Sequence, residues 1–107
     1  MLKGKKIAIL GDMLELGTVA AKQHHKIGTV VANTEIDYLF TIGELAAQIA
    51  QGALEAGMIE EQVFSYETKE EAQTKLKQVA QSQNTILIKA SRGMKLEEII
   101  DMLEDKE

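Results

Sequence analysis

The sequence predicts an α/β fold, an open, doubly wound parallel sheet with helices on both faces. Four apolar runs, each too short for a helix and rich in β-branched or aromatic residues, lie at residues 7–10, 38–42, 63–66 and 85–88. Continuous apolar runs are typical of strands buried on both faces, as in parallel sheets. Helical patterns follow each run, and right-handed crossovers between parallel strands place such helices on the faces of the sheet.

Four helices are expected from apolar side chains that recur with helical spacing. The first covers residues 18–33. The apolar sides are formed by Val19, Gln23, Ile27, Val30 and Val31 in the first helix, by Leu45, Ile49, Ala53 and Leu54 in the second, by Ala72, Leu76 and Val79 in the third, and by Leu96, Ile99, Ile100 and Leu103 in the last. Gly57 is suited to end the second helix, and Thr68 with Glu71 forms a capping box that starts the third.

Composition limits the class of protein. The 107 residues fit one domain, residues 1–107. Cysteine is absent, so no disulfide framework, thiol nucleophile or thiolate metal site is expected. The net charge of −5 argues against binding nucleic acid. No apolar run approaches the roughly 20 residues that span a bilayer, and no signal peptide opens the chain, so we expect a cytoplasmic protein without membrane insertion.

A binding site is expected beyond the carboxyl ends of the strands, where ligands of open α/β sheets bind. Four loops qualify: residues 11–17, 43–44, 67–68 and 90–94. The first and the last are chemically the richest. In the first, Gly11 and Gly17 allow tight turns, and the Asp12 carboxylate could accept a hydrogen bond from a ligand amine or from a neighbouring loop. Asp12 could equally form an Asx-turn and only shape its own loop.

The last loop has the character of an anion site. Lys89, Ser91, Arg92 and Gly93 lie at the turn from the fourth strand into the last helix. Free N–H groups at a helix start favour anions, and the planar fork of Arg92 matches a carboxylate or phosphate. Ser91 could instead simply cap the last helix.

His24 and His25 are adjacent in the first helix, where His24 leans toward the apolar side. His24 is either a histidine at the edge of the core or a residue that orients the loop of residues 11–17. Adjacent histidines point to different sides of a helix, and no ligand set accompanies them, so we expect no metal site. Walker, dinucleotide-binding and nucleophile-elbow motifs are absent from the sequence, and no catalytic residue is expected in this chain.

Four segments in order resemble the C-terminal domain of the Mur ligases: residues 9–17, His24 with Gly28, residues 39–44 and residues 89–95. Spacing selects His24 rather than His25 as the family-like histidine, and Ala90 stands where the family usually has glycine. The resemblance implies a Rossmann-like domain with strand order 3-2-1-4, which makes the first and fourth strands neighbours. The loops of Asp12 and of Ser91 and Arg92 would then face each other.

The resemblance further implies the C-terminal, substrate-binding domain of a bacterial three-domain ligase of peptidoglycan synthesis. ATP and Mg²⁺ would be held mainly by the central domain. The terminal carboxylate of a UDP-N-acetylmuramoyl-tripeptide would become an acyl phosphate, which the amine of D-alanyl-D-alanine attacks. In related ligases, loops like those of Asp12 and of Lys89, Ser91 and Arg92 contact the incoming amino compound, whereas the isolated chain would be inactive.

Two other functions are compatible with the α/β pattern. A receiver-type signalling domain would use Asp12 and Lys89, but it needs an acceptor aspartate after a middle strand. The second and third strands are followed by Gly43-Glu44 and by Glu67, so that acceptor is missing. The other alternative is a small-ligand or protein-interaction module without a catalytic parent.

Overall fold

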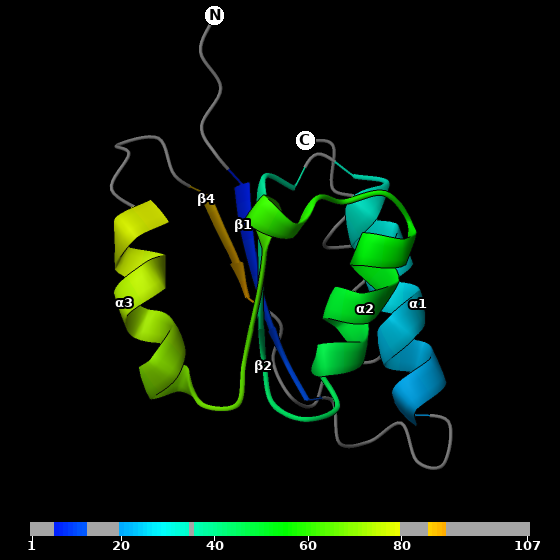
Figure 1. The fold of residues 1–107 in the computed structure, drawn as a ribbon, viewed down its shortest axis with the longest axis horizontal. Coiled ribbons are helices and arrows are strands. Elements are labelled where there is room, and N and C mark those ends of the chain that lie inside the picture. The colour runs from blue at the N-terminus through cyan, green and yellow to red at the C-terminus, as the bar shows by residue number, and fades with distance from the viewer. Residues whose placement is uncertain (1–5, 13–19, 35, 80–85, 90–107) are drawn as a thin grey trace, which may run out of the picture.

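A parallel sheet forms the centre of the molecule (Figure 1). The computed structural model describes residues 6–12, 20–34, 36–79 and 86–89. The strands are β1 (Lys6–Gly11), β2 (Tyr38–Ile42), β3 (Val63–Tyr66) and β4 (Ile86–Lys89). Their order is β3-β2-β1-β4, and all neighbours are parallel. The predicted α/β fold with a parallel sheet is confirmed, and the second and third strands have the predicted bounds.

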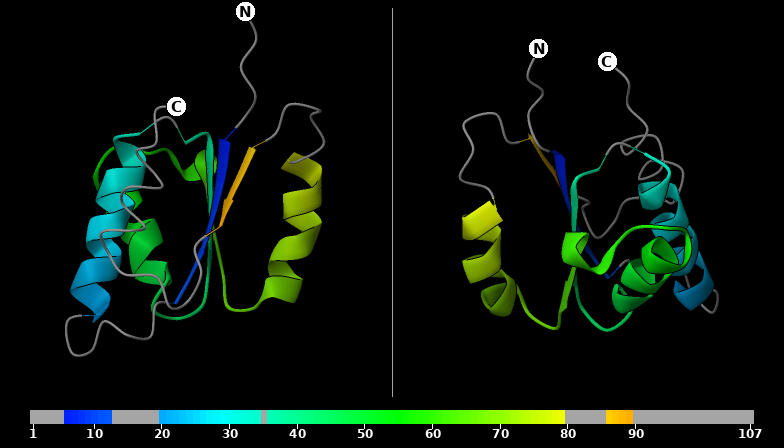
Figure 2. Two further views of the ribbon diagram at one scale, coloured as in Figure 1. Left: turned by 180° about the vertical axis from the view of Figure 1, so that it is seen from behind. Right: turned by 45° about the horizontal axis from the view of Figure 1, so that its top comes forward.

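Helices cover both faces of the sheet. Helices α1 (Ala20–Ala32) and α2 (Ala47–Glu55) lie on one face, and α3 (Lys69–Val79) lies on the other (Figure 2). A short 3₁₀ turn that was not predicted, η2 (Glu60–Gln62), leads into β3. None of the helices described here is long and apolar enough to cross a membrane. The expected last helix lies outside the described residues.

The two faces of the sheet bury two separate clusters. Ala8, Leu10 and Leu39 pack against the α1–α2 side, whereas Ile7 and Phe40 pack against the α3 side. All five side chains are fully buried. Because successive side chains of a strand point to opposite faces, the apolar runs of β1 and β2 supply both clusters at once.

Strand β3 differs from the prediction of burial on both faces. Ser65 is exposed, and Val63, Phe64 and Tyr66 are only half-buried. The reason is position, since β3 pairs with β2 alone and lies at an edge. Phe64 still contributes packing, because its ring stacks on Phe40 with the centroids 4.9 Å apart.

Helix α2 buries small residues. Its buried side begins at Ala46, just before the helix, and continues through Ile49, Ala50 and Ala53. The predicted stripe named Leu45 and Leu54, which are half-buried. The prediction is confirmed at Ile49 and Ala53. The small residues Ala50 and Gly52 complete the buried side, where they let α2 approach α1 more closely than leucine would.

Two glycines form the contact between α1 and α2. A Cβ added to Gly28 would overlap the carbonyl oxygen of Ile49 and lie 2.6 Å from the nitrogen of Ala53. A Cβ added to Gly52 would overlap the carbonyl oxygen of His25. Both glycines are buried, so the two backbones cross at a distance that admits no side chain.

The predicted end of α2 is confirmed. Gly57 has φ +118°, a conformation that L side chains rarely adopt. Its N–H donates to the carbonyl oxygen of Leu54 (3.2 Å), and the N–H of Met58 donates to that of Ala53 (3.0 Å). These two bonds form a Schellman motif, which satisfies carbonyl groups that the last helical turn leaves free.

The predicted capping box at the start of α3 is also confirmed. The N–H of Glu71 donates to Oγ1 of Thr68, and the N–H of Thr68 donates to Oε1 of Glu71, both at 3.3 Å. A local sequence pattern of four residues therefore fixed this helix start.

Candidate functional site

The carboxyl ends of the strands, after which the sequence predicts the loops of the site, lie at one edge of the sheet. Gly11, the last residue of β1, lies opposite Ile42, the last residue of β2. On the other side of β1, Ile9 lies opposite Lys89 at the end of β4. The chain leaving β1 therefore has the end of β2 on one side and the end of β4 on the other.

Asp12 is bonded to the start of α2. Its side chain is half-buried just past β1, and its Oδ1 accepts a hydrogen bond of 2.6 Å from the backbone N–H of Ala46. Among the roles predicted for this carboxylate, the structure records a bond to a neighbouring loop. A contact with a ligand amine stays a prediction.

Gly43, which the sequence analysis did not single out, occupies a position at this edge of the sheet where only glycine fits. It has φ +120°, and a Cβ added to it would lie 2.6 Å from Cγ of Asp12. Gly11 has more room, since a Cβ there would lie 3.5 Å from the carbonyl oxygen of Ile42, an ordinary contact. The loop-shaping role of Gly11 stays a prediction.

Of the residues of the predicted anion site, the structure describes only Lys89. Lys89 ends β4 beside Ile9. Gly17, Ser91, Arg92 and Gly93 lie outside the described residues, as do the loops that hold them.

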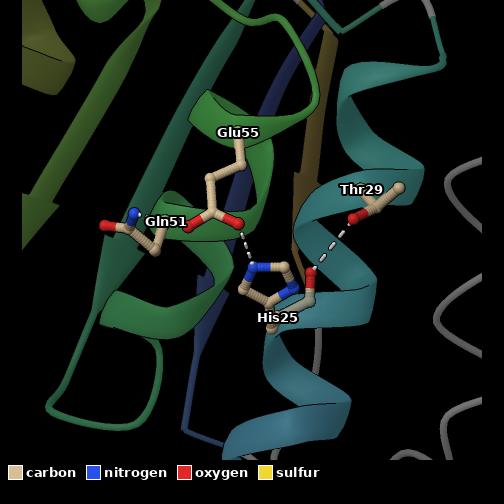
Figure 3. Close-up of polar contacts among 4 residues, drawn as sticks. All are labelled: His25, Thr29, Gln51 and Glu55. Carbon is tan, nitrogen blue, oxygen red and sulfur yellow. Dashed lines mark hydrogen bonds and ion pairs between the residues drawn. The ribbon is translucent and has the colours of Figure 1, made fainter.

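The two histidines point to different sides of α1, as predicted. His24 is fully buried, which confirms that it leans toward the apolar side. His25 is partly exposed, and its Nε2 lies 2.9 Å from Oε1 of Glu55 on α2 (Figure 3). Gln51 donates to the other oxygen of Glu55 at 2.7 Å. An orienting role of His24 toward the loop of residues 11–17 stays a prediction.

The contacts of Glu55 with His25 and Gln51 make the stability of the fold depend on pH. The hydrogen bond from Gln51, and next the contact with His25, hold the pKa of Glu55 below its ordinary value of 4.5. A carboxyl group whose pKa is lowered by folding adds stability above its unfolded pKa and loses that contribution as the pH falls through its folded pKa.

We therefore expect wild type to be more stable than Glu55→Gln at pH 6, with a difference that shrinks below about pH 4.5. Urea unfolding of both proteins between pH 3 and pH 7 measures this difference. Glu60→Gln, which alters an exposed glutamate of η2, is the matched control. A difference that grows as the pH falls would contradict the expectation.

An open pocket of about 580 Å³ lies beside this edge, between the loops that follow β2 and β3. It is lined by Gly43, Glu44, Ala47, Ser65, Tyr66, Glu67 and Glu71. Glu71 is already engaged in the capping box, and Ser65 Oγ accepts from Thr41 Oγ1 at 2.8 Å. Within the described ranges, no group of three or more His, Cys, Asp or Glu side chains is placed to hold a metal ion. Sequence reasoning passed over the pocket because each of its two loops contributes few functional groups.

A parallel sheet with helices on both faces, and with the carboxyl ends of its strands at one edge, defines a Rossmann-like α/β domain. The family profile described as Mur ligase, glutamate ligase domain, matches residues 1–92, and the chain belongs to this family.

Known relatives share the sequence and the fold. The chain is 45% identical over 102 residues to the UDP-N-acetylmuramoyl-tripeptide–D-alanyl-D-alanine ligase of Bacillus subtilis (strain 168), covering 94% of this chain and 22% of that protein. The ligase of the same name from Escherichia coli (strain K12) is 28% identical, with 97% of this chain and 22% of that protein covered. Crystal structure II of MurF from Acinetobacter baumannii matches with a TM-score of 0.68 and 26% identity, over 98% of this chain and 23% of that chain. The chain spans about a fifth of the length of these relatives.

Proposed function

We propose that this chain is the C-terminal domain of a cytoplasmic, ATP-dependent ligase that adds D-alanyl-D-alanine to UDP-N-acetylmuramoyl-tripeptide in peptidoglycan synthesis. The observation that carries the proposal is the 45% identity, over 94% of the chain, with the Bacillus subtilis ligase of that name. The same identity favours a ligase domain over the receiver-like or stand-alone binding module.

Neither the motifs of the sequence nor the residues that the structure describes fit ATP and Mg²⁺. The sequence has no phosphate-binding P-loop motif, and no metal-ligand group occurs in the described part of the chain. We therefore assign ATP and Mg²⁺ mainly to the central domain of the whole enzyme, and the UDP-linked tripeptide to its N-terminal domain. The role left for this domain is to bind the dipeptide and to orient its amine toward the acyl phosphate of the tripeptide. Attack forms the C–N bond, expels phosphate and releases a proton from the amine.

The dipeptide would lie between the loop of Asp12 and the loop of Lys89, Ser91 and Arg92. Support comes from the pairing of β1 with β4, which brings the starts of both loops to neighbouring positions. The cationic side chains of the second loop suit the single carboxylate of the dipeptide, and the helix that the sequence predicts after Ser91 would add free N–H groups. The strand order 3-2-1-4 implied by the family has these two strands as neighbours.

A chimera tests this function. We expect the Bacillus subtilis ligase to keep its activity when its matching segment is replaced by residues 1–107 of this chain. Phosphate release should then require ATP, the UDP-linked tripeptide and D-alanyl-D-alanine together, and mass spectrometry should detect the ligated product. The isolated chain is the control and should show no saturable ATP hydrolysis. A folded chimera that forms no product, or ATP hydrolysis by the isolated chain, would contradict the proposal.

A further inference from the structure

The helical turn that leads into α2 has no capping side chain of its own. Ala46 already has a helical conformation (φ −63°, ψ −21°) and makes no side-chain cap. The N–H of Ala47 donates to the carbonyl oxygen of Gly43 at 3.2 Å, which is a helical bond between residues four apart. Gly43 therefore stands where an N-cap residue stands, and it has no side chain with which to cap.

The Asp12 carboxylate fills the place of that missing side chain. A Cβ added to Gly43 would lie 2.6 Å from Cγ and 2.8 Å from Oδ2 of Asp12. Oδ1 of Asp12 accepts from the N–H of Ala46, three residues after Gly43, which is a position that N-cap side chains bond. The negative charge also stands at the positive end of the helix dipole. Asp12 thus caps α2 from a loop that lies 34 residues earlier in the chain.

We propose that this cap makes Asp12 a positioning residue, which fixes the end of β1 to the start of α2 instead of binding the substrate amine itself. The inference rests on the proposed function, in which the loop after β1 faces the dipeptide. A carboxylate that left its cap to bind an amine would leave the N–H of Ala46 without this acceptor. Both oxygens also lie close to the Cβ position of Gly43, so the group is turned toward α2.

Three variants separate positioning from direct binding. Asp12→Ala removes the cap, whereas Asp12→Asn keeps an oxygen that can accept from Ala46 but loses the charge. Asp37→Ala is the matched control, because Oδ2 of Asp37 accepts from the backbone N–H of Lys6 at 2.8 Å. That bond joins the same two strands at the opposite, amino edge of the sheet.

Stability and amide exchange are measured on the 107-residue chain. Asp12→Ala should raise the unfolding equilibrium constant roughly two- to thirtyfold, the range for loss of a helix cap. Asp37→Ala should also destabilise the chain, because it removes a hydrogen bond from the N–H of Lys6 to a charged group. Hydrogen exchange at the Ala46 N–H should accelerate in Asp12→Ala, stay near wild type in Asp12→Asn and be unaffected in Asp37→Ala. Unchanged exchange in Asp12→Ala would overturn the cap, whether or not the proposed function holds.

Kinetics are measured in the chimera at a temperature where every variant is folded. Asp12→Ala should lower kcat/KM for the dipeptide by up to about a hundredfold, the scale for small misplacements in an active site. Asp12→Asn should recover most of that loss, and Asp37→Ala should leave kcat/KM unchanged. If Asp12→Asn lowered kcat/KM as much as Asp12→Ala while exchange at the Ala46 N–H stayed near wild type, the charge would be needed for more than the cap and Asp12 would be a direct ligand. A chimera with wild-type sequence that forms no product would instead contradict the proposed function, and the exchange result would stand.

Discussion

Gly28→Ala is expected to destabilise the chain by at least about 2 kcal/mol, toward the upper part of the range for overpacked cores. The new Cβ would overlap the carbonyl oxygen of Ile49 and approach the nitrogen of Ala53 to 2.6 Å. Both neighbours are backbone atoms, so no rotamer change can relieve the clash, and α1 must move away from α2. The higher helix propensity of alanine, about 1 kcal/mol, offsets only part of this loss.

Denaturant unfolding of the wild type and the variant measures the effect. Gly52→Ala places a Cβ on the other side of the same crossing, against the carbonyl oxygen of His25, and should be similarly destabilising. Gly11→Ala is the control, because its Cβ would lie at 3.5 Å from the carbonyl oxygen of Ile42 and the backbone φ is not positive. A Gly28→Ala protein as stable as wild type would show that the helices do not cross this closely.

Arg92→Ala is expected to raise the apparent KM for D-alanyl-D-alanine roughly tenfold to over a hundredfold in the chimera. The dipeptide carries one carboxylate, and loss of a hydrogen bond to a charged group costs about 1.5–3 kcal/mol. The KM for ATP should change much less, because the proposed ATP site lies in another domain. Arg92→Lys should recover only part of the loss, since an ammonium group cannot bind a carboxylate bidentately.

Steady-state kinetics on both Arg92 variants, together with their thermal stability, test this role. The competing role for Arg92 is an ion pair with Glu97 or Asp12 that steadies the loop. If the dipeptide KM stays at the wild-type value while stability falls, Arg92 is structural. The anion site would then be sought first at Lys89 or at the backbone of Ser91.

Local patterns in the sequence determined much of the fold. The runs of β2 and β3 have the bounds that the structure shows, because four or five residues rich in apolar, β-branched or aromatic side chains are sufficient to indicate a strand. The sequence also predicted the capping box of Thr68 and Glu71 and the helix end at Gly57. Each depends on residues at most a few positions apart, so their physics is contained in a short stretch of sequence.

Only part of the candidate site could be predicted from the sequence. That Asp12 lies at the carboxyl edge follows from its place directly after the first strand of a parallel sheet. Its bond to a neighbouring loop was one of the alternatives that the sequence left open. The partner, the N–H of Ala46, could not be named because a backbone N–H carries no sequence signal. The sequence does not distinguish Gly43 from any other turn glycine, because what requires glycine there is the Asp12 carboxylate, which occupies the space of a side chain.

The sequence by itself thus determined the α/β class, the strands, two helix ends and the edge of the sheet where a site should lie. Tertiary structure alone decided the glycine crossing of α1 and α2, the burial of Ala50 and Gly52 in α2, the half-exposed β3 and the Asp12 cap. The physical reason is distance along the chain. A hydrogen-bonding pattern within one turn depends on residues that are close in sequence. A contact between positions such as 12 and 46 forms only after the sheet has aligned the strands that precede them.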